Sequence, residues 1–301
     1  MKKGTKITKH LRDNSRARKH FFSEDYFDKI DTEEKAYWLG FIYADGYIKH
    51  RKGAYALTIG LSSKDHNHVV KFDNAVGYDS EIKIRTDKLG YKNSTITLYS
   101  KKMVISLLRC GLYQNKSLTI EPWSGPEHLM KAYWLGVFDG DGGFCKNVKK
   151  LKNGTSVTRY SFNLYGTFAM VDGLKKFISR QELCKGKGTI REHYSIWRLY
   201  YGGTEKTQKI SNFMYLNMDT FLQRKKDIAD EIEKILFTKY KIRDLDENML
   251  LKLFHKLGSW EKVAYALKIS RNGLYKHLRR SNMPRRKWVP NFCFDFRKTL
   301  F

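Results

Sequence analysis

The sequence predicts an α+β protein made of two pseudo-symmetric halves and a small all-α domain that follows them. The main observation is a duplicated stretch, KAYWLGFIYADGYI at residues 35–48 and KAYWLGVFDGDGGF at residues 131–144, in which the first six letters are identical. Both copies also contain an Asp-Gly pair near their end. Each copy precedes a similar succession of strand-like and helix-like segments, which stops near Lys241, where only helical patterns remain.

The first copy predicts a helix from Thr32 to about Ala44. Asp31 is in position to act as its N-cap, and Glu34 lies three residues later, as a capping box requires. Apolar residues follow at helical spacing, and Gly46 is placed to end the helix at C′.

The second copy follows the same pattern. Ser124 is the expected N-cap, Pro126 lies in the first turn and Glu127 at N3, and Gly142 and Gly143 end the helix.

Each of these helices is followed by strand-like segments. These segments alternate apolar and polar residues and are rich in Thr, Ile and Tyr. They lie at residues 55–63, 81–87 and 93–100 in the first half and at residues 159–167, 188–193 and 195–203 in the second. Helical patterns lie at residues 64–77, 102–112, 169–183 and 205–215. Each half is therefore predicted as helix–strands–helix–strands–helix.

Charge is the strongest global property of the chain. The sequence has 58 Lys and Arg against 31 Asp and Glu, which gives a formal net charge of +27. Basic surfaces bind nucleic acids because neutralising phosphates releases counterions. We therefore expect a polyanionic partner.

Composition excludes several other classes. The chain is 41% hydrophobic and 14% aromatic, enough to form cores, and no apolar run approaches the roughly 20 residues of a membrane span. The basic N-terminus lacks the apolar stretch of a secretory signal. The four cysteines are scattered without a C-x-x-C pair, which favours reduced thiols and a cytoplasmic location, in a bacterial or phage-infected cell or an organelle matrix.

Small residues recur four apart within each repeated helix. Gly40 and Ala44 share one face of the first helix, and Gly136 and Gly140 share one face of the second. Such faces let two helices approach closely, and a symmetric contact would bring the C-terminal residues Asp45 and Asp141 together.

Two carboxylates at adjoining helix C-termini repel each other and the partial negative charge there, so a bound cation would stabilise them. Carboxylate and carbonyl oxygens suit Mg²⁺ or another divalent cation. Beside a basic surface, this arrangement predicts metal-assisted phosphodiester hydrolysis.

The C-terminal region predicts a helix-turn-helix domain. Residues 259–269 and 270–280 form two helical patterns with a tight turn, and Ser270 is the expected N-cap of the second. The second helix would present Arg271, Asn272, Tyr275, Lys276 and Arg279 to DNA. The apolar stripe would form the domain core; it comprises Val263, Ala264, Leu267, Ile269, Leu274 and Leu278.

The predicted boundaries divide the chain into five parts. These are a basic arm at 1–20, the halves at 21–124 and 125–240, the helix-turn-helix domain at 241–283 and a basic, aromatic tail at 284–301.

WLGFIYADG (Trp38–Gly46) and WLGVFDGDG (Trp134–Gly142) resemble the two motifs of a single-chain LAGLIDADG homing endonuclease. The resemblance covers about residues 21–240. It implies an αββαββα fold in each half, with two four-stranded sheets that form a saddle on DNA in the major groove. It also implies a monomer that is encoded in a mobile intron and makes a metal-dependent double-strand cut in DNA at a long asymmetric site.

The resemblance also implies residue roles. The eighth motif residue is the metal-binding acid, which falls on Asp45 and Asp141, and the carbonyls before them, of Ala44 and Gly140, would bind the same metal. A basic residue after the last helix of each half would lie near the cleavage site, which places Lys116 and Lys225 there, in a catalytic role or as ordinary phosphate contacts. The halves differ at the sixth motif position, which is Tyr43 in one and Asp139 in the other.

Outward strand side chains are the expected DNA-binding set, through bases or phosphates. Alternation places the following residues there: Arg51, Lys83, Arg85, Thr95, Thr97, Arg159, Asn163, Arg191 and Arg198.

Two other functions fit this organisation. One is a non-catalytic transcription regulator with a LAGLIDADG unit and a helix-turn-helix domain, although such proteins lose the motif acids that this chain keeps. The other is an intron RNA maturase, since binding intron RNA also needs a basic surface.

Overall fold

The computed structural model describes residues 20–51, 53–79, 81–150, 156–184, 188–243, 247–267 and 269–281, without the side chains of 235–243 and 266. The chain divides into two compact units, Met1–Ala229 (unit 1) and Asp230–Phe301 (unit 2). The expected tail and nearly all of the expected basic arm lie outside the described residues. Among the described helices, none has the length and apolar character to cross a membrane.

Unit 1 contains two copies of one succession of elements. The first copy is α1 (Glu33–Asp45), β1 (Gly46–Arg51), β2 (Ala54–Ser62), α2 (His66–Val76), β3 (Ile84–Thr86), β4 (Lys92–Leu98) and α3 (Lys101–Arg109), with short 3₁₀ turns η2 (Ser63–Asp65) and η3 (Lys116–Leu118). The second copy is α4 (Glu127–Asp141), β5 (Gly142–Lys150), β6 (Ser156–Gly166), α5 (Phe168–Arg180), β7 (Thr189–His193), β8 (Ile196–Gly202) and α6 (Thr204–Tyr215).

The two sheets have the same topology. Strand order is β1-β2-β4-β3 in the first and β5-β6-β8-β7 in the second, and neighbouring strands are antiparallel. Helices pack on one face of each sheet, α2 and α3 on the first and α5 and α6 on the second. The predicted α+β class with two αββαββα halves is confirmed.

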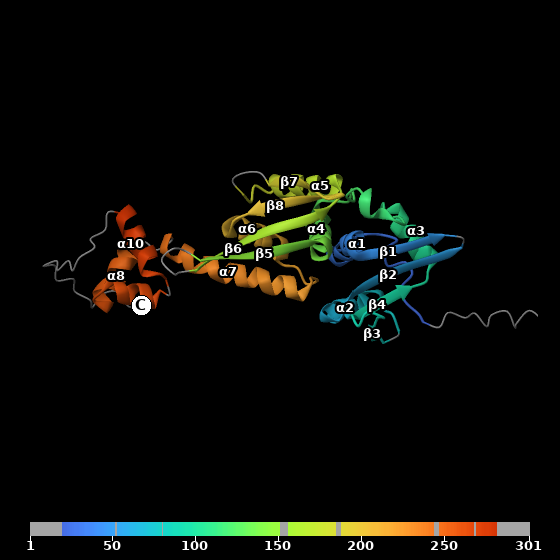
Figure 1. Cartoon of the computed structure of the whole chain (residues 1–301), viewed down its shortest axis with the longest axis horizontal. Coiled ribbons are helices and arrows are strands. Elements are labelled where there is room, and N and C mark those ends of the chain that lie inside the picture. The colour runs from blue at the N-terminus through green and yellow to red at the C-terminus, as the bar shows by residue number, and fades with distance from the viewer. Residues whose placement is uncertain are drawn as a thin grey trace, which may run out of the picture. The chain divides into compact units, whose positions relative to one another are not determined.

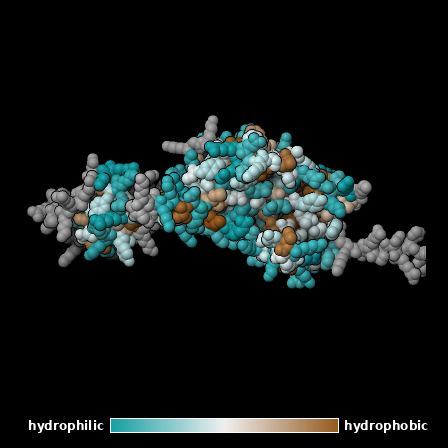
Figure 2. All heavy atoms as spheres, in the orientation of Figure 1, coloured by the Kyte–Doolittle hydropathy of each residue, from teal (hydrophilic) through white to brown (hydrophobic). Residues whose placement is uncertain are grey.

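Helices α1 and α4 lie side by side between the two sheets (Figure 1). Every residue of α1 from Ala36 to Tyr43 is buried, and so is every residue of α4 from Ala132 to Asp139. A helix that is apolar on all sides belongs in a core, and one hydrophobic cluster includes residues of both halves. The outer surface of unit 1 is mainly hydrophilic on the face that Figure 2 shows.

The faces by which these helices touch are the ones predicted. A Cβ added to Gly40 would lie 2.0 Å from the carbonyl oxygen of Tyr133, and one added to Gly136 would lie 2.0 Å from that of Tyr37. Only glycine permits such backbone contact, so the duplicated glycines position the two helices symmetrically.

The predicted helix caps were partly wrong. Thr32, not Asp31, caps α1 by accepting from Lys35 N–H, whereas Asp31 accepts from the Lys35 ammonium at 2.9 Å. Pro126, not Ser124, stands at the N-cap of α4. Gly46 and Gly142 end their helices in extended conformations with φ of −82° and −93°, because strands β1 and β5 follow at once.

The start of α7 (Gln223–Arg243) closes unit 1, and the alternation pattern did not reveal this helix. Unit 2 then contains α8 (Glu247–Leu257), α9 (Trp260–Ala266) and α10 (Arg271–Arg280). Ser270 caps α10 as predicted, by accepting from Gly273 N–H. Val263, Ala264, Leu274 and Leu278 are buried in the small core of this unit, with the half-buried Leu267 and Ile269 packed against them.

Candidate active site

The two motif carboxylates meet where α1 and α4 end. A Cβ added to Gly140 would lie 2.2 Å from the Cβ of Ala44 and 3.4 Å from Oδ2 of Asp45, so the Asp45 carboxylate extends to the backbone of the other motif. Asp45 and Asp141 are the last residues of α1 and α4, each follows a residue of the Ala44–Gly140 contact, and the charge of Asp45 acts on Asp141. The structure therefore brings together the two acids that the duplication predicted.

These carboxylates affect one another although both residues are exposed. Burial at the end of the helix pair, together with the nearby charge of Asp45, raises the pKa of Asp141 to about 6. Burial also raises the pKa of Asp45, while Lys225 and Lys116 lower it. Two carboxyl groups that resist ionising together, beside the ammonium groups of Lys116 and Lys225, are typical of a functional site that binds charged ligands.

Lys225 and Lys116 reach the same helix ends. The buried ammonium of Lys225 lies within hydrogen-bond distance of four carbonyls at the end of α4: Phe138 at 2.8 Å, Asp139 at 2.7 Å, Gly140 at 3.3 Å and Gly142 at 2.6 Å. Its three N–H donors are therefore shared among these four acceptors. The Lys116 ammonium, also buried, donates to the Ala44 carbonyl at 3.3 Å. Burial lowers the pKa of Lys116, and it lowers that of Lys225 to about 8. Each lysine therefore neutralises the negative end of a motif helix.

The residues present fit a divalent cation. Asp45 and Asp141 supply carboxylate oxygens, the hard donors that Mg²⁺ prefers, and their mutual repulsion would be relieved by a cation. Among the described residues, no group of three or more His, Cys, Asp or Glu side chains is arranged to hold a metal, so any such ion would depend on these two acids and backbone carbonyls. The carbonyls of Ala44 and Gly140 already accept from the lysines.

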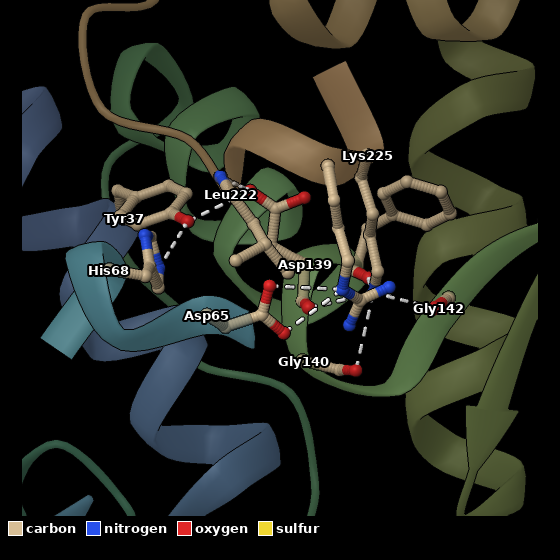
Figure 3. Close-up of polar contacts among 10 residues, drawn as sticks. Tyr37, Asp65, His68, Asp139, Gly140, Gly142, Leu222 and Lys225 are labelled. Carbon is tan, nitrogen blue, oxygen red and sulfur yellow. Dashed lines mark hydrogen bonds and ion pairs between the residues drawn. The ribbon is translucent and has the colours of Figure 1, made fainter. Parts of the chain in front are cut away.

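Asp139, the acid at the sixth motif position, lies in a different environment (Figure 3). Its carboxylate is fully buried and accepts from Tyr37 Oη at 2.8 Å, Tyr215 Oη at 2.8 Å and Leu222 N–H at 2.7 Å. His68 Nε2 lies 3.0 Å from Tyr37 Oη, and burial lowers the pKa of His68 to about 3, so its ring is neutral. Because Tyr37 gives its only hydroxyl hydrogen to Asp139, Nε2 of His68 is the donor in this contact. Burial raises the pKa of Asp139, while its hydrogen bonds oppose that change.

This network joins the two halves and the start of α7. Tyr37 and His68 come from the first half, and Asp139 from the second. Leu222 immediately precedes α7, so its bond to Asp139 fixes the turn that carries Lys225. Nearby, the Arg224 guanidinium pairs with the carboxylate of Asp65 in the first half at 2.9 Å. Sequence reasoning missed Tyr37, His68, Tyr215 and Leu222.

The corresponding position of the first half is Tyr43, whose side chain makes different contacts. Tyr43 packs edge-on against Tyr133, with ring centroids 5.2 Å apart, and its hydroxyl donates to the carbonyl of Cys110. Tyr43 therefore points away from the carboxylates, as Asp139 does, and neither side chain belongs to the pair of motif acids.

Neither a family model nor a curated protein matches the sequence. Solved structures do match. The meganuclease I-SmaMI bound to uncleavable DNA is 14% identical, with a TM-score of 0.50 over 72% of this chain and 94% of that one. I-SmaMI bound to an uncleaved DNA target in the presence of calcium ions is 13% identical, with a TM-score of 0.50 over 74% and 96%. The LAGLIDADG homing endonuclease I-LtrWI bound to target DNA is 12% identical, with a TM-score of 0.49 over 76% and 95%.

The chain has the two-domain LAGLIDADG fold. At these identities the likeness establishes the fold and no more. In this LAGLIDADG fold, the motif helices are α1 and α4, and the sheets that they precede turn their uncovered faces outward.

Most of the expected DNA-binding side chains lie on these uncovered faces. Arg51, Arg85, Thr95, Arg159 and Arg191 are exposed on strands, and Thr97 and Arg198 are half-buried there. Two placements were wrong. Lys83 is exposed but precedes β3, and Asn163, although on the outward side of β6, is only 1% exposed because neighbouring side chains cover it.

In unit 2, Asn272, Lys276 and Arg279 are exposed on α10. Arg271 and Tyr275 both contact Glu261 of α9, at 3.0 Å and 2.9 Å, so these two also tie the helices of the unit together.

Proposed function

We propose that the chain is a site-specific DNA endonuclease that cuts both strands of a long asymmetric target with the help of a divalent cation. The observation that carries the proposal is the meeting of Asp45 and Asp141 at the close-packed ends of α1 and α4. The net charge of +27 and the DNA-bound state of the matched I-SmaMI structures support DNA as the substrate.

Asp45 and Asp141 would hold the cation, with carbonyls of Ala44 and Gly140 within the same group. When bound, Mg²⁺ supplies an activated water and stabilisation of the leaving oxygen. The chain itself supplies the positive charge of Lys116 and Lys225 beside the carboxylates. These ammonium groups would stabilise the negative charge that builds up on the reacting phosphate, or hold that phosphate in place.

The two unequal halves explain why a single chain would cut an asymmetric site. Each half presents one outward sheet face, and the residues on these faces differ between the halves. One chain can therefore read two different half-sites and place its two acids between them. The exposed basic residues of α10 would add DNA contacts as a helix-turn-helix recognition helix.

Cleavage in vitro tests the proposal. The substrate is a DNA duplex in which the two sequences that flank the gene are joined directly, without the intron. It is incubated with Mg²⁺ in one reaction and with EDTA in another. We expect Mg²⁺-dependent double-strand cutting that Asp45→Asn or Asp141→Asn abolishes while DNA binding is retained.

Asp172→Asn is the matched control. The half-buried Asp172 pairs with the exposed Lys176 at 2.8 Å on α5, and such surface pairs contribute little, so cutting should be unchanged. Tight binding without cutting by the unmodified chain would instead favour a DNA-binding regulator, and preferential binding of the intron RNA would favour a maturase.

A further inference from the structure

The outward face of the second sheet carries a guanidinium that a buried amide holds in place. Arg198 on β8 donates from Nε at 2.9 Å and from Nη2 at 2.6 Å to Oδ1 of Asn163 on β6. A guanidinium has donors only, so the amide oxygen must face it. Asn163 is 1% exposed, which makes it a fixed support and not a surface side chain.

Two tyrosines confine the same guanidinium. Its central carbon lies 5.7 Å from the ring centroid of Tyr165, which is directly opposite Arg198 in the sheet, and 5.0 Å from that of Tyr200. Contacts of this kind restrict the rotamers of a long side chain before any ligand binds. Arg198 therefore loses less conformational freedom on binding than a solvated arginine would.

The donors that remain free have a defined geometry. An arginine has five N–H donors in a planar fork, and Asn163 takes the Nε edge. The Nη1 and Nη2 hydrogens at the tip of the fork are left, spaced to match two adjacent acceptors. Guanine O6 and N7 in the major groove are such a pair.

Asn163 itself is not available for adenine. Its Nδ2 lies 3.3 Å from Cys145 Sγ and 3.4 Å from the carbonyl of Gly143, inside the sheet, while its oxygen is used by Arg198. A bidentate amide contact to adenine needs both groups free.

Charge favours a polyanion such as DNA as the ligand, and position favours one of its bases as the group that Arg198 contacts. Arg191 stands directly opposite Arg198 on the neighbouring strand, and like charges opposite one another are unfavourable unless an anion lies close. Asn163 and Arg198 occupy β6 and β8, the two central strands of the sheet. The centre of a sheet that enters a groove faces base edges, whereas its rims face phosphates.

Building on the proposed DNA binding, we propose that Arg198 recognises one guanine of the target and that Asn163 is the positioning residue for that contact. Arg198 is thus a specificity determinant of the second half.

Binding and cleavage of a duplex library, in which each position of the target is varied in turn, test this inference. At one position the unmodified chain should prefer guanine about 10- to 100-fold over the other bases. Arg198→Ala should remove that preference, and Asn163→Ala should weaken it, while preferences at other positions stay the same. Asn163→Asp keeps an oxygen acceptor for the guanidinium and should restore the preference, a rescue that a merely structural role would not give.

Lys176→Ala is the control, since Lys176 is exposed on α5, which packs on the covered face of this sheet. This variant should leave the preference for guanine at that target position unchanged. If Arg198→Ala instead weakens binding equally for all sequences and lowers the salt slope by about one, Arg198 contacts a phosphate and the inference is overturned. Failure of the unmodified chain to bind duplex DNA would overturn the proposed function as well, whereas normal cutting with an unaltered guanine preference in Arg198→Ala would overturn only the inference.

Discussion

Replacing Gly136 by alanine should separate the helix pair on which the two carboxylates depend. The added Cβ would lie 2.0 Å from the Tyr37 carbonyl oxygen and 2.7 Å from the Phe41 nitrogen, against the 3.4–4 Å of an ordinary contact. Both neighbours are backbone atoms of a buried helix, so no side chain can rotate away. The helices would have to move apart by more than about 1 Å, since the shortfall is of that size.

The magnitude follows from two opposing terms. Overpacking a core costs about 1–3 kcal/mol, and a clash with rigid backbone belongs at the upper end. Alanine gains about 1 kcal/mol of helix propensity over glycine. We therefore expect a net loss of about 2 kcal/mol in the free energy of unfolding, or a Tm lower by roughly 4–8 °C for a domain of this size.

Chemical denaturation and cleavage measure the two consequences. Gly40→Ala should behave alike, because its Cβ would lie 2.0 Å from the carbonyl oxygen of Tyr133. Both variants should also cut DNA slowly at temperatures where they remain folded, since Asp45 and Asp141 would no longer meet. Gly143→Ala is the control, because nothing lies within 4 Å of its added Cβ. If Gly136→Ala instead stabilises the chain by about 1 kcal/mol, propensity alone acts at that position and the close contact is refuted.

Three further predictions concern the lysines, the buried histidine and α10. Since burial lowers the pKa of His68 to about 3 from an ordinary 6.5, only the unfolded chain takes up this proton as the pH falls below 6.5, and stability decreases. Denaturation should therefore show that the unmodified chain loses about 2 kcal/mol more than His68→Gln between pH 6.5 and 5; parallel pH profiles would contradict this. Lys225→Met should lower the free energy of unfolding by about 3 kcal/mol, because four helix-end carbonyls lose their donor. Lys116→Met should lower it by about 1 kcal/mol, because one carbonyl loses its donor, and equal losses in the two variants would contradict this prediction. Arg279→Ala should weaken DNA binding and lower its salt slope by about one, and an unchanged slope would argue against a DNA contact by α10.

Sequence reasoning predicted those helices and strands in which the pattern of apolar and polar residues matches the buried and exposed sides. Helix α1 and strands such as β2 and β8 are apolar on the sides that enter the core, and the small residues of α1 and α4 indicated their contact. Strands β1 and β5 escaped detection by pattern because most of their residues are not buried, so no alternation is visible in them. Only the family resemblance supplied the fourth strand of each sheet.

The residues of the site that could be predicted are those that recur in both copies of the repeated motif. Asp45 and Asp141 repeat in the sequence, whereas the partners of Asp139 come from separate elements and are known only once the chain is folded. One signal was present, since the tyrosine of KAYWLG recurs as Tyr37 and Tyr133. Asn163 was misplaced because alternation gives the side of a strand but not what covers it.

The two halves use this repeated tyrosine differently, and the difference explains their unequal lysines. In each half it faces the sixth motif position of the other helix, as a hydrogen bond from Tyr37 to Asp139 and as an edge-on contact of Tyr133 with Tyr43. A buried carboxylate needs several donors, and the turn before α7 supplies one of them. That same turn places Lys225 against four carbonyls, whereas Lys116, on the side of Tyr43, has one described carbonyl partner. The asymmetry at the sixth motif position is therefore part of how each half supports its own lysine, and not the decay of one copy.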